Sequence, residues 1–484
     1  MAAELLLPRA MRMKLHDVRA MVPTMERLAR DMVEKCRGLP LAVVVLSGLL
    51  SHKRGIEEWQ KVKAHIWRHM KDDSIEISYI LSLSYNDLSI VLKQCFLYFA
   101  IFPEDHVSDA EHLMWLWMAE GIHDLLRDLA EQKASELNFF DIYDPKGNSI
   151  SSLCLRHGIH DQAERYLSLD LSNLKLRSVI FLDRKCKIDL IKFSNMFQHI
   201  YVLHLETRSG TILPDAIGSL YHLKLLSLRG IRHLPSSIGN LKNLQTLRVF
   251  DSDHLLRLPP ETANLINLRH LVAFYSNPLQ VSKLTNLQVL KYAHCDQWKN
   301  VDPINLVNLQ ELVMHDINQS YSLNKISSLK NLSILKLSCD DNESFPDYEY
   351  LSSCQKLYKL WLRGTIEKLP LPSQFPNSIT MIALRNSFLT EDPMPILGML
   401  PNLRNLDLVA AYEGTEITCG DNSFCQLEFL RLYHLEDLER WHLVSSAMPL
   451  IKGFGISYCP KLKEIPKRMK DVAIPERLLE TYFG

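Results

Sequence analysis

The sequence predicts an α+β multidomain protein in which an N-terminal helical bundle precedes a long solenoid of parallel strands. Three observations predict this fold class. About one residue in six is leucine, far above ordinary usage. From residue 200 onward the pattern L-x-x-L-x-L recurs at steps of 19 to 25 residues. Residues 25–140 instead place apolar side chains at helical spacing, in segments joined by short polar connections.

The recurring pattern predicts one short strand in each unit of a leucine-rich-repeat horseshoe. Alternate leucines of L-x-L lie on the same side of a strand, so they can stack between neighbouring coils. This period is typical of leucine-rich repeats, which form curved solenoids. The first apolar positions of the units are Ile200, Leu223, Leu244, Leu268, Leu287, Leu309, Leu332, Leu357, Ile379, Leu403, Leu427 and Ile451. A weaker unit at residues 174–182 opens the array, and residues 459–466 close it.

Two further features mark the edges of the coils. Asparagine precedes the first leucine of several units, at Asn243, Asn267, Asn286, Asn308, Asn331 and Asn402. Early units carry L-P-x-x-I after the strand, as in Leu234, Pro235 and Ile238. Because proline donates no sheet hydrogen bond, these segments are predicted on the irregular outer side of the solenoid.

The N-terminal part has a different pattern. Leu28, Met32 and Val33 share one helical face, and Gly38 followed by Pro40 marks the end of that helix. We therefore divide the chain into an unassigned segment 1–24, a helical domain 25–140, a polar linker 141–172 and the solenoid 173–484.

Charge and composition exclude several classes of function. Lys and Arg number 55 against 56 Asp and Glu, so the net charge of −1 predicts neither a nucleic acid nor a membrane surface as partner. The most apolar stretch, residues 41–50, is about half the length that a membrane span needs. The cysteines form no C-x-x-C pair, which favours a reducing compartment. No triad or metal-ligand pattern is readable, so the sequence predicts no enzyme.

Several motifs ahead of the repeats resemble a known module. These are GLPLA at residues 38–42, CFLYFAIFPED at 95–105 and WLWMAEG at 115–121, followed by IHD at 122–124. Their order and wording resemble the second half of the nucleotide-binding (NB-ARC) module of plant coiled-coil-class leucine-rich-repeat disease-resistance receptors. With the repeats, the resemblance covers nearly the whole chain from about residue 25.

The resemblance implies an ADP- or ATP-binding site. In that family the proline of GLPL packs on the adenine, and the histidine of a Met-His-Asp motif contacts the phosphates. Carried over, this points to Pro40 with its neighbour Leu41, and to His123 supported by Asp124. The alternative for His123 and Asp124 is an ordinary helix N-cap.

The sequence departs from the family pattern in ways that predict impaired nucleotide binding. The 484 residues contain no G-x-x-x-x-G-K-S/T phosphate loop, no strand ending in paired aspartates and no coiled-coil signalling domain. Gly121-Ile122 runs directly into His123-Asp124, so we expect a truncated winged helix. We therefore interpret the chain as an N-terminally truncated member of the family.

The outward-facing strand positions are the candidate partner-binding residues. In each unit the residue between the last two apolar positions points out of the concave face. These positions, with the next outward ones, predict a basic strip with exposed aromatics: Arg248, Lys291, Lys336, Trp361, Arg363, Arg385, Arg431 and Tyr433. Arg and aromatic residues are typical of binding hot spots. The alternative is an ordinary solvated face, in which long basic side chains cover the sheet.

The resemblance implies a cytoplasmic innate-immunity receptor whose repeats bind a pathogen effector or a guarded host protein. Contact between the repeats and the nucleotide-binding half of the same chain is a further expectation. Two other interpretations remain open. One is a repeat-containing adaptor, such as a substrate receptor of a ubiquitin ligase. The other is a non-functional product of a truncated gene.

Overall fold

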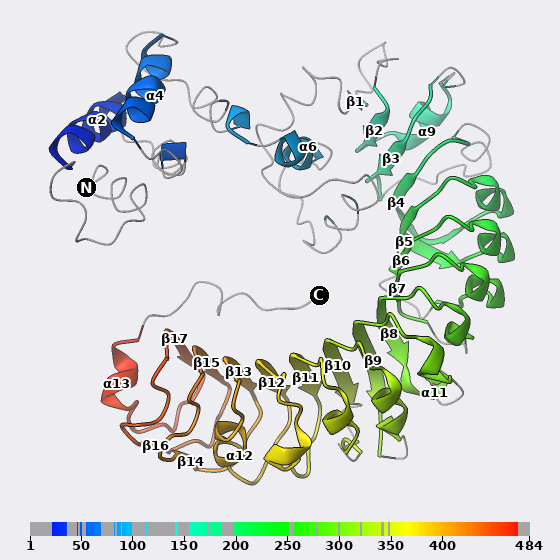
Figure 1. Ribbon diagram of the computed structural model, residues 1–484. Helices are drawn as coiled ribbons and strands as arrows, with labels where there is room; N and C mark the ends of the chain where they lie inside the picture. The colour runs from blue at the N-terminus through cyan, green and yellow to red at the C-terminus, as the bar shows by residue number, and fades with distance from the viewer. Residues whose placement is uncertain are drawn as a thin grey trace. The chain divides into compact units, whose positions relative to one another are not determined.

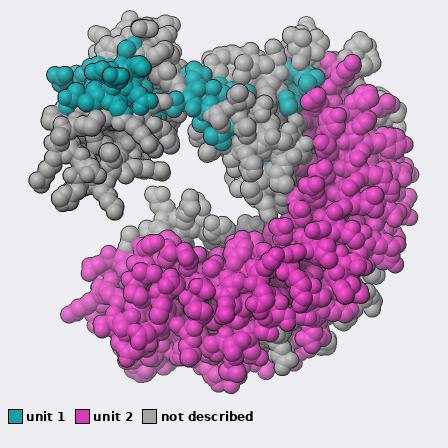
Figure 2. Space-filling model, in the orientation of Figure 1, with its two compact units in different colours: residues 1–160 teal, residues 161–484 magenta. Residues whose placement is uncertain are grey.

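A computed structural model describes the chain over most of its C-terminal two thirds and over shorter N-terminal segments. The described residues are 22–35, 46, 49–50, 55–68, 82, 85–88, 90–98, 113, 116, 141–143, 154–169, 171, 174–184, 197–250, 256–275, 279–298, 301–319, 322–339, 343–346 and 349–472. The chain divides into two compact units, Met1–His160 and Asp161–Gly484 (Figure 2). Each unit is described by itself.

The described helices of the first unit bury the apolar faces that the sequence predicts. They are α2 (Val22–Lys35), α4 (Ile56–Arg68) and α6 (Ile90–Tyr98). Leu28, Met32 and Val33 of α2 are buried together, as their helical spacing requires, and Trp59 of α4 is also buried. An ion pair between Asp31 and Lys63 joins α2 to α4. These helices fit the predicted helical domain, whereas the bundle and the winged helix remain predictions.

The segment expected as a polar linker contains secondary structure. Strand β1 (Asp141–Ile142) pairs in parallel with β2 (Arg156–Ile159), and helix α9 (Ala163–Leu167) follows. Tyr166 of α9 is completely buried. Its ring contacts Phe181 edge-on, at a centroid distance of 5.8 Å. The range 141–172, predicted as a polar linker, thus contains two strands and a helix, because buried apolar side chains such as Ile159 and Tyr166 are interspersed among the polar ones.

The second unit is the predicted solenoid. Its main sheet contains β3 (Ser178–Phe181), β4 (Val202–Ile212), β5 (Leu225–His233), β6 (Thr246–Phe250), β7 (His270–Ala273), β8 (Val289–His294), β9 (Glu311–Ile317), β10 (Ile334–Cys339), β11 (Lys359–Arg363), β12 (Met381–Arg385), β13 (Asn405–Val409), β15 (Phe429–Tyr433) and β17 (Gly453–Ser457). Neighbours in this order pair in parallel. Figure 1 shows these strands along the inner side of a curved array.

The core of the solenoid is a set of leucine rows that run across the strands. Leu360 of β11 pairs in register with Leu335 of β10 and Ile382 of β12, and the row continues through Leu406 and Leu430. All five side chains are at most 2% exposed. Burial of a leucine side chain contributes about 1.5–3 kcal/mol, so these rows are the main stabilising element of every coil.

The outer side of the early coils consists of short 3-10 helices, at Asp215–Ser219, Ser236–Asn240 and Pro260–Asn264. A proline precedes each of them in extended conformation, as the L-P-x-x-I pattern predicts. These helices stack closely. A Cβ atom added at Gly239 would lie 2.8 Å from the carbonyl oxygen of Glu261, so a larger residue there would push the coils apart.

The asparagines that precede the strands form a ladder along one edge of the sheet. Each side-chain amide donates to a backbone carbonyl of the preceding coil, over 2.6 to 3.0 Å. The bonds run from Asn243 to Tyr221, Asn267 to Lys242, Asn286 to Ile266, Asn308 to Thr285, Asn331 to Val307 and Asn402 to Asn377. The ladder therefore pairs backbone carbonyls of the turns that precede the strands.

The last coils carry a second sheet and a closing helix. Strand β14 (Glu416–Cys419) pairs in parallel with β16 (Arg440–Leu443). The expected closing unit at residues 459–466 forms no strand, and helix α13 (Lys467–Lys470) follows it. Arg468 of α13 donates to the carbonyls of Ser445, Ala447 and Met448. This guanidinium thus covers the backbone at the end of the solenoid. Helix α11 (Cys295–Trp298) and helix α12 (Met394–Gly398) lie between strands of the array.

The asparagine ladder generates a stability prediction. Replacing Asn286 with alanine removes one inter-coil hydrogen bond, so the free energy of unfolding should fall by about 1 kcal/mol. Hydrogen exchange of the amides of β7 and β8 would report the loss locally. Asn324→Ala, at an exposed asparagine outside the ladder, is the matched control and should leave exchange unchanged. Equal protection in both variants would contradict the structural role of the ladder.

Candidate partner-binding surface

The predicted outward residues lie on one face of the sheet, in rows of register neighbours that are interrupted between β8 and β9. Arg248 is in register with Ser227 and Val272, and the line continues from Val272 to Lys291. Further along, Lys336 is in register with Trp361, Trp361 with Ala383, and Asp407 with Arg431. Arg363, Arg385 and Tyr433 belong to the next outward line. The repeat pattern alone therefore places all eight predicted residues on one face.

The exposure of these residues differs from the prediction of a solvent-facing basic strip. Lys291 and Arg385 are each only 6% exposed, while Arg363 is exposed and Trp361 and Arg431 are half-buried. His204, at an outward position of β4, is 3% exposed. The predicted strip is therefore a surface of mixed exposure, because Lys291 and Arg385 pack against Glu311 and Asp407 of adjacent strands.

Glu311 compensates part of the positive charge of Lys291 and Lys336. Its Oε1 atom lies 3.2 Å from Nζ of Lys291 and 3.7 Å from Nζ of Lys336. The Glu311 side chain is 11% exposed and that of Lys291 8% exposed, so this contact is shielded from solvent. Glu311 occupies the first outward position of β9, which the predicted strip does not include. The available signal was one acidic residue at a position that carries apolar, polar or basic side chains in the neighbouring strands.

A cation–aromatic ladder runs across β11 to β15. We define it as Trp361, Arg385, Asp407, Arg431 and Tyr433. The guanidinium carbon of Arg385 lies 5.6 Å from the ring centroid of Trp361, and that of Arg431 lies 4.9 Å from the ring of Tyr433. Asp407 stands between the two arginines, 3.2 Å from Nη2 of Arg385 and 3.9 Å from Nε of Arg431. The ladder therefore alternates aromatic, positive and negative groups.

The aromatic end of the ladder continues onto β17. The Tyr433 ring lies 5.1 Å from the ring of Tyr458 and 4.8 Å from that of His434. His434 and Tyr458 stack nearly parallel at 4.7 Å. Tyr458 is 64% exposed. Large exposed rings of this kind are typical of protein-binding surfaces, since they bury much area at low entropic cost.

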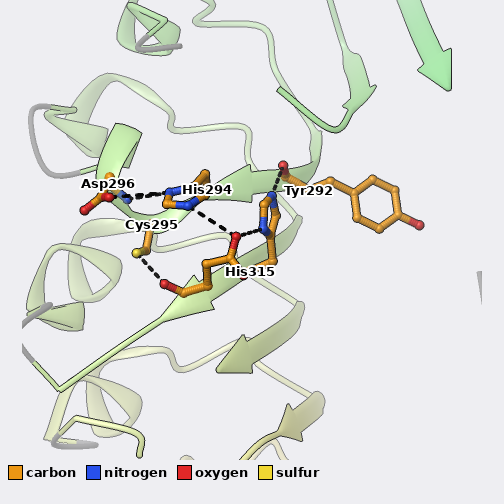
Figure 3. Close-up of polar contacts among 6 residues, drawn as sticks. Tyr292, His294, Cys295, Asp296 and His315 are labelled. Atoms are coloured by element: carbon orange, nitrogen blue, oxygen red, sulfur yellow. Dashed lines mark hydrogen bonds and ion pairs between the residues drawn. The ribbon is translucent and has the colours of Figure 1, made fainter. Parts of the chain in front are cut away.

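A second group of rings and histidines lies on β8 and β9 and just after β7, and Figure 3 shows its members Tyr292, His294 and His315. The rings of Phe274 and Tyr292 stack at a centroid distance of 4.0 Å, and the His315 ring lies 5.6 Å from Phe274. Asp316 Oδ2 lies 2.6 Å from Nδ1 of His315 and 3.2 Å from Nε2 of His294. One carboxylate thus holds two imidazoles on the outward face.

The backbone in this group is irregular. Tyr292 and Asp316 adopt left-handed backbone conformations, with φ of 67° and 56°. The register between β8 and β9 shifts between Leu290 and Ala293. Both nitrogens of His315 face oxygen acceptors, namely Asp316 Oδ2 and the Tyr292 carbonyl at 3.0 Å. The repeat pattern does not predict this group, because it assumes regular strands through these positions.

His270 is a buried titratable group on the same face. It is 5% exposed, and its Nδ1 atom lies 2.8 Å from the Thr246 hydroxyl. Burial, together with the positive charges of Arg269 and Lys291, lowers the pKa of His270 to about 4. The folded chain therefore holds His270 neutral at pH values where an exposed histidine is protonated.

The four residues predicted to bind a nucleotide lie outside the part of the chain that the structure describes. They are Pro40, Leu41, His123 and Asp124. Among the described residues, no group of His, Cys, Asp or Glu is arranged to hold a metal ion. No helix within the described segments is long and apolar enough to cross a membrane.

A family model described as a leucine-rich repeat region matches residues 175–474. The chain belongs to the leucine-rich-repeat family. The match covers the strands from β3 to β17, together with the outward residues discussed above.

The chain is also similar to disease resistance proteins of Arabidopsis thaliana. The putative disease resistance RPP13-like protein 3 is 32% identical, over 92% of this chain and 58% of the relative. Disease resistance protein RPP13 is 30% identical, over 93% of this chain and 57% of the relative. The probable disease resistance RPP8-like protein 4 is also 30% identical, over 92% and 57%. The chain spans a little more than half the length of these relatives.

The cation–aromatic ladder generates a second prediction. Asp407→Asn leaves Arg385 without its carboxylate partner in a setting where its side chain is 8% exposed, so the free energy of unfolding should fall by about 2 kcal/mol. Asp437→Asn breaks an exposed, solvent-screened ion pair with Lys461 and should lower the free energy of unfolding much less. Urea unfolding of the two variants measures this difference. An equal loss would refute the structural role of Asp407.

The low pKa of His270 generates a third prediction. The unfolded chain binds a proton near the ordinary pKa of 6.5, whereas the folded chain resists it down to about 4. Stability contributed by neutral His270 is therefore fully present above pH 6.5 and lost as pH falls toward 4, by roughly 3 kcal/mol. His270→Gln should flatten this dependence in urea unfolding at a series of pH values, while His222→Gln, at an exposed histidine, should not. An unchanged slope in His270→Gln would contradict the assignment.

Proposed function

We propose that this chain acts in plant innate immunity as the recognition part of a disease-resistance receptor in the cytoplasm. Its repeats bind a protein, either a pathogen effector or a host protein that an effector modifies. The observation that carries the proposal is the similarity to disease resistance proteins over more than nine tenths of the chain. The role proposed is recognition, with no catalytic step.

The surface chemistry supports a protein partner. The outward face combines half-buried Trp361 and Tyr433 with arginines stacked on both rings. Arginine and large aromatic residues dominate the energetics of protein interfaces. The carboxylates of Glu311 and Asp407 stand within the same face and would repel a phosphate backbone.

For nucleotide binding, we propose that these 484 residues hold ADP weakly at best. The motif positions Pro40 and His123 resemble those of the family, but the chain carries no phosphate loop to supply backbone N–H groups and a lysine charge. Calorimetric titration with ADP should accordingly give no binding at micromolar concentration. Micromolar or tighter binding would contradict this part of the proposal.

The receptor role is tested by co-purification from leaves. The tagged chain is expressed together with individual members of a panel of pathogen effectors. We expect one effector, or the host protein that it modifies, to co-purify with the wild type and to be lost with the variant Trp361→Ala/Tyr433→Ala. The matched control is Tyr221→Ala, at an exposed tyrosine outside the strands.

The adaptor interpretation predicts the opposite outcome. A ubiquitin-ligase scaffold would co-purify with the wild type, and no effector or effector target would do so. That result would overturn the receptor role. The similarity to disease resistance proteins favours the receptor over the adaptor.

A further inference from the structure

The outward face of β8 to β15 carries an excess of positive charge that its own carboxylates compensate only in part. Within the three outward positions of each strand, the charged residues are the cations Lys291, Lys336, Lys359, Arg363, Arg385 and Arg431 and the anions Glu311 and Asp407. One further carboxylate, Asp316, lies at the irregular end of β9 and contacts His294 and His315. This local excess contrasts with the net charge of −1 of the whole chain. It marks one region of an otherwise balanced protein.

Each of the two carboxylates is shared between two cations. Glu311 faces Lys291 at 3.2 Å and Lys336 at 3.7 Å. Asp407 faces Arg385 at 3.2 Å and Arg431 at 3.9 Å. In both groups the carboxylate lies closer to the more buried cation, so Lys336 and Arg431 are the more exposed and more distant partners.

Arg363 adds a cation at the surface. It is exposed, and within the described segments of the chain it has no hydrogen-bond or ion-pair partner. Arg363 follows Trp361 by two residues on β11, so both side chains lie on the same face. Lys336 is the register neighbour of Trp361 on β10. The half-buried indole therefore lies between two cations that are only weakly compensated.

Glu311 and Asp407 make the surface selective among anions. A polynucleotide carries a continuous row of phosphates, which would meet both carboxylates as it crosses the strands. A polypeptide with spaced acidic side chains can place them beside Lys336 and Arg363 and set an apolar side chain on Trp361. Aromatic and arginine contacts of this kind favour a protein chain.

We propose that the surface formed by Lys336, Trp361 and Arg363 binds an acidic segment of a second protein. The inference rests on the proposed recognition function and specifies its partner chemistry. The partner's carboxylates supply the negative charge that Glu311 and Asp407 provide only in part. Binding is expected to weaken with salt, because exposed charges are screened over about 10 Å at 0.1 M ionic strength.

The test uses the full chain and a fluorescein-labelled oligo-glutamate peptide interrupted by single leucines, with binding followed by fluorescence anisotropy. The variant Lys336→Glu/Arg363→Glu should raise the Kd about tenfold or more and remove most of its salt dependence. The control Lys330→Glu/Lys368→Glu makes the same change in net charge at exposed lysines outside the strands, and should change the Kd less than about twofold. An equal effect of both pairs would overturn the proposal.

Two further arms complete the test. Trp361→Leu should weaken binding of the leucine-containing peptide but leave binding of plain oligo-glutamate within about twofold, and an equal loss for both peptides would count against the indole contact. A single-stranded oligonucleotide should not displace the peptide at equal concentration, and efficient displacement would overturn the assignment to an acidic protein. Circular dichroism unfolding midpoints verify that every variant is folded.

The outcome is separable from that of the proposed function. If an effector co-purifies in a Trp361-dependent manner but neither peptide binds, the receptor role stands and the acidic-segment proposal fails. If the peptides bind as expected but only a ligase scaffold co-purifies, the receptor role fails and the surface chemistry stands.

Discussion

The registration of parallel strands between successive coils is the constraint on which the rest of the repeat unit depends. A strand such as β11 forms its hydrogen bonds with β10 and β12, and its leucines are buried only when all three are in register. A slip of one residue would turn Leu360 and Leu362 outward and bury Trp361. The register that buries the leucines therefore also places the outward residues of neighbouring strands side by side. The core and the candidate surface both depend on this register.

The length of each coil decides which polar contacts accompany this register. In the last coils the apolar positions recur every 24 residues, and ion pairs join residues of the same spacing, as in Arg404–Glu428–Lys452 and Glu439–Lys463. Between the coils that begin at Leu287 and Leu309 the step is 22 residues, and strands β8 and β9 lose regular pairing between Leu290 and Ala293. The histidine group of His294, His315 and Asp316 lies at that irregularity. Coils of equal length thus repeat the same inter-coil ion pair, whereas the irregular pairing of β8 and β9 accompanies a group of contacts that occurs at that place.

The sequence predicts the regular features because they follow from periodicity alone. The strand positions, the buried leucines, the asparagine edge and the outward line containing Arg248 and Trp361 all depend on a spacing that repeats. Exposure and pairing depend on side-chain lengths in adjacent coils, so the burial of Lys291 and Arg385 could not be predicted from one unit at a time. The left-handed turns at Tyr292 and Asp316 carry no glycine signal, which explains why the histidine group was missed.

The carboxylates on the outward face affect both the stability of the strand register and the charge that the face would present to the proposed partner. A sheet face without Glu311 and Asp407 would hold closely spaced cations, and their mutual repulsion would oppose the strand register that brings them together. A face with one carboxylate for each cation would present no net charge to a partner. Sharing one carboxylate between two cations lowers the repulsion between those cations. The more exposed Lys336 and Arg431 stay at a longer distance from the carboxylate, so their charges remain accessible to a partner. Stability of the solenoid and availability of its charge are therefore properties of the same contacts, and a change at either acidic residue alters both.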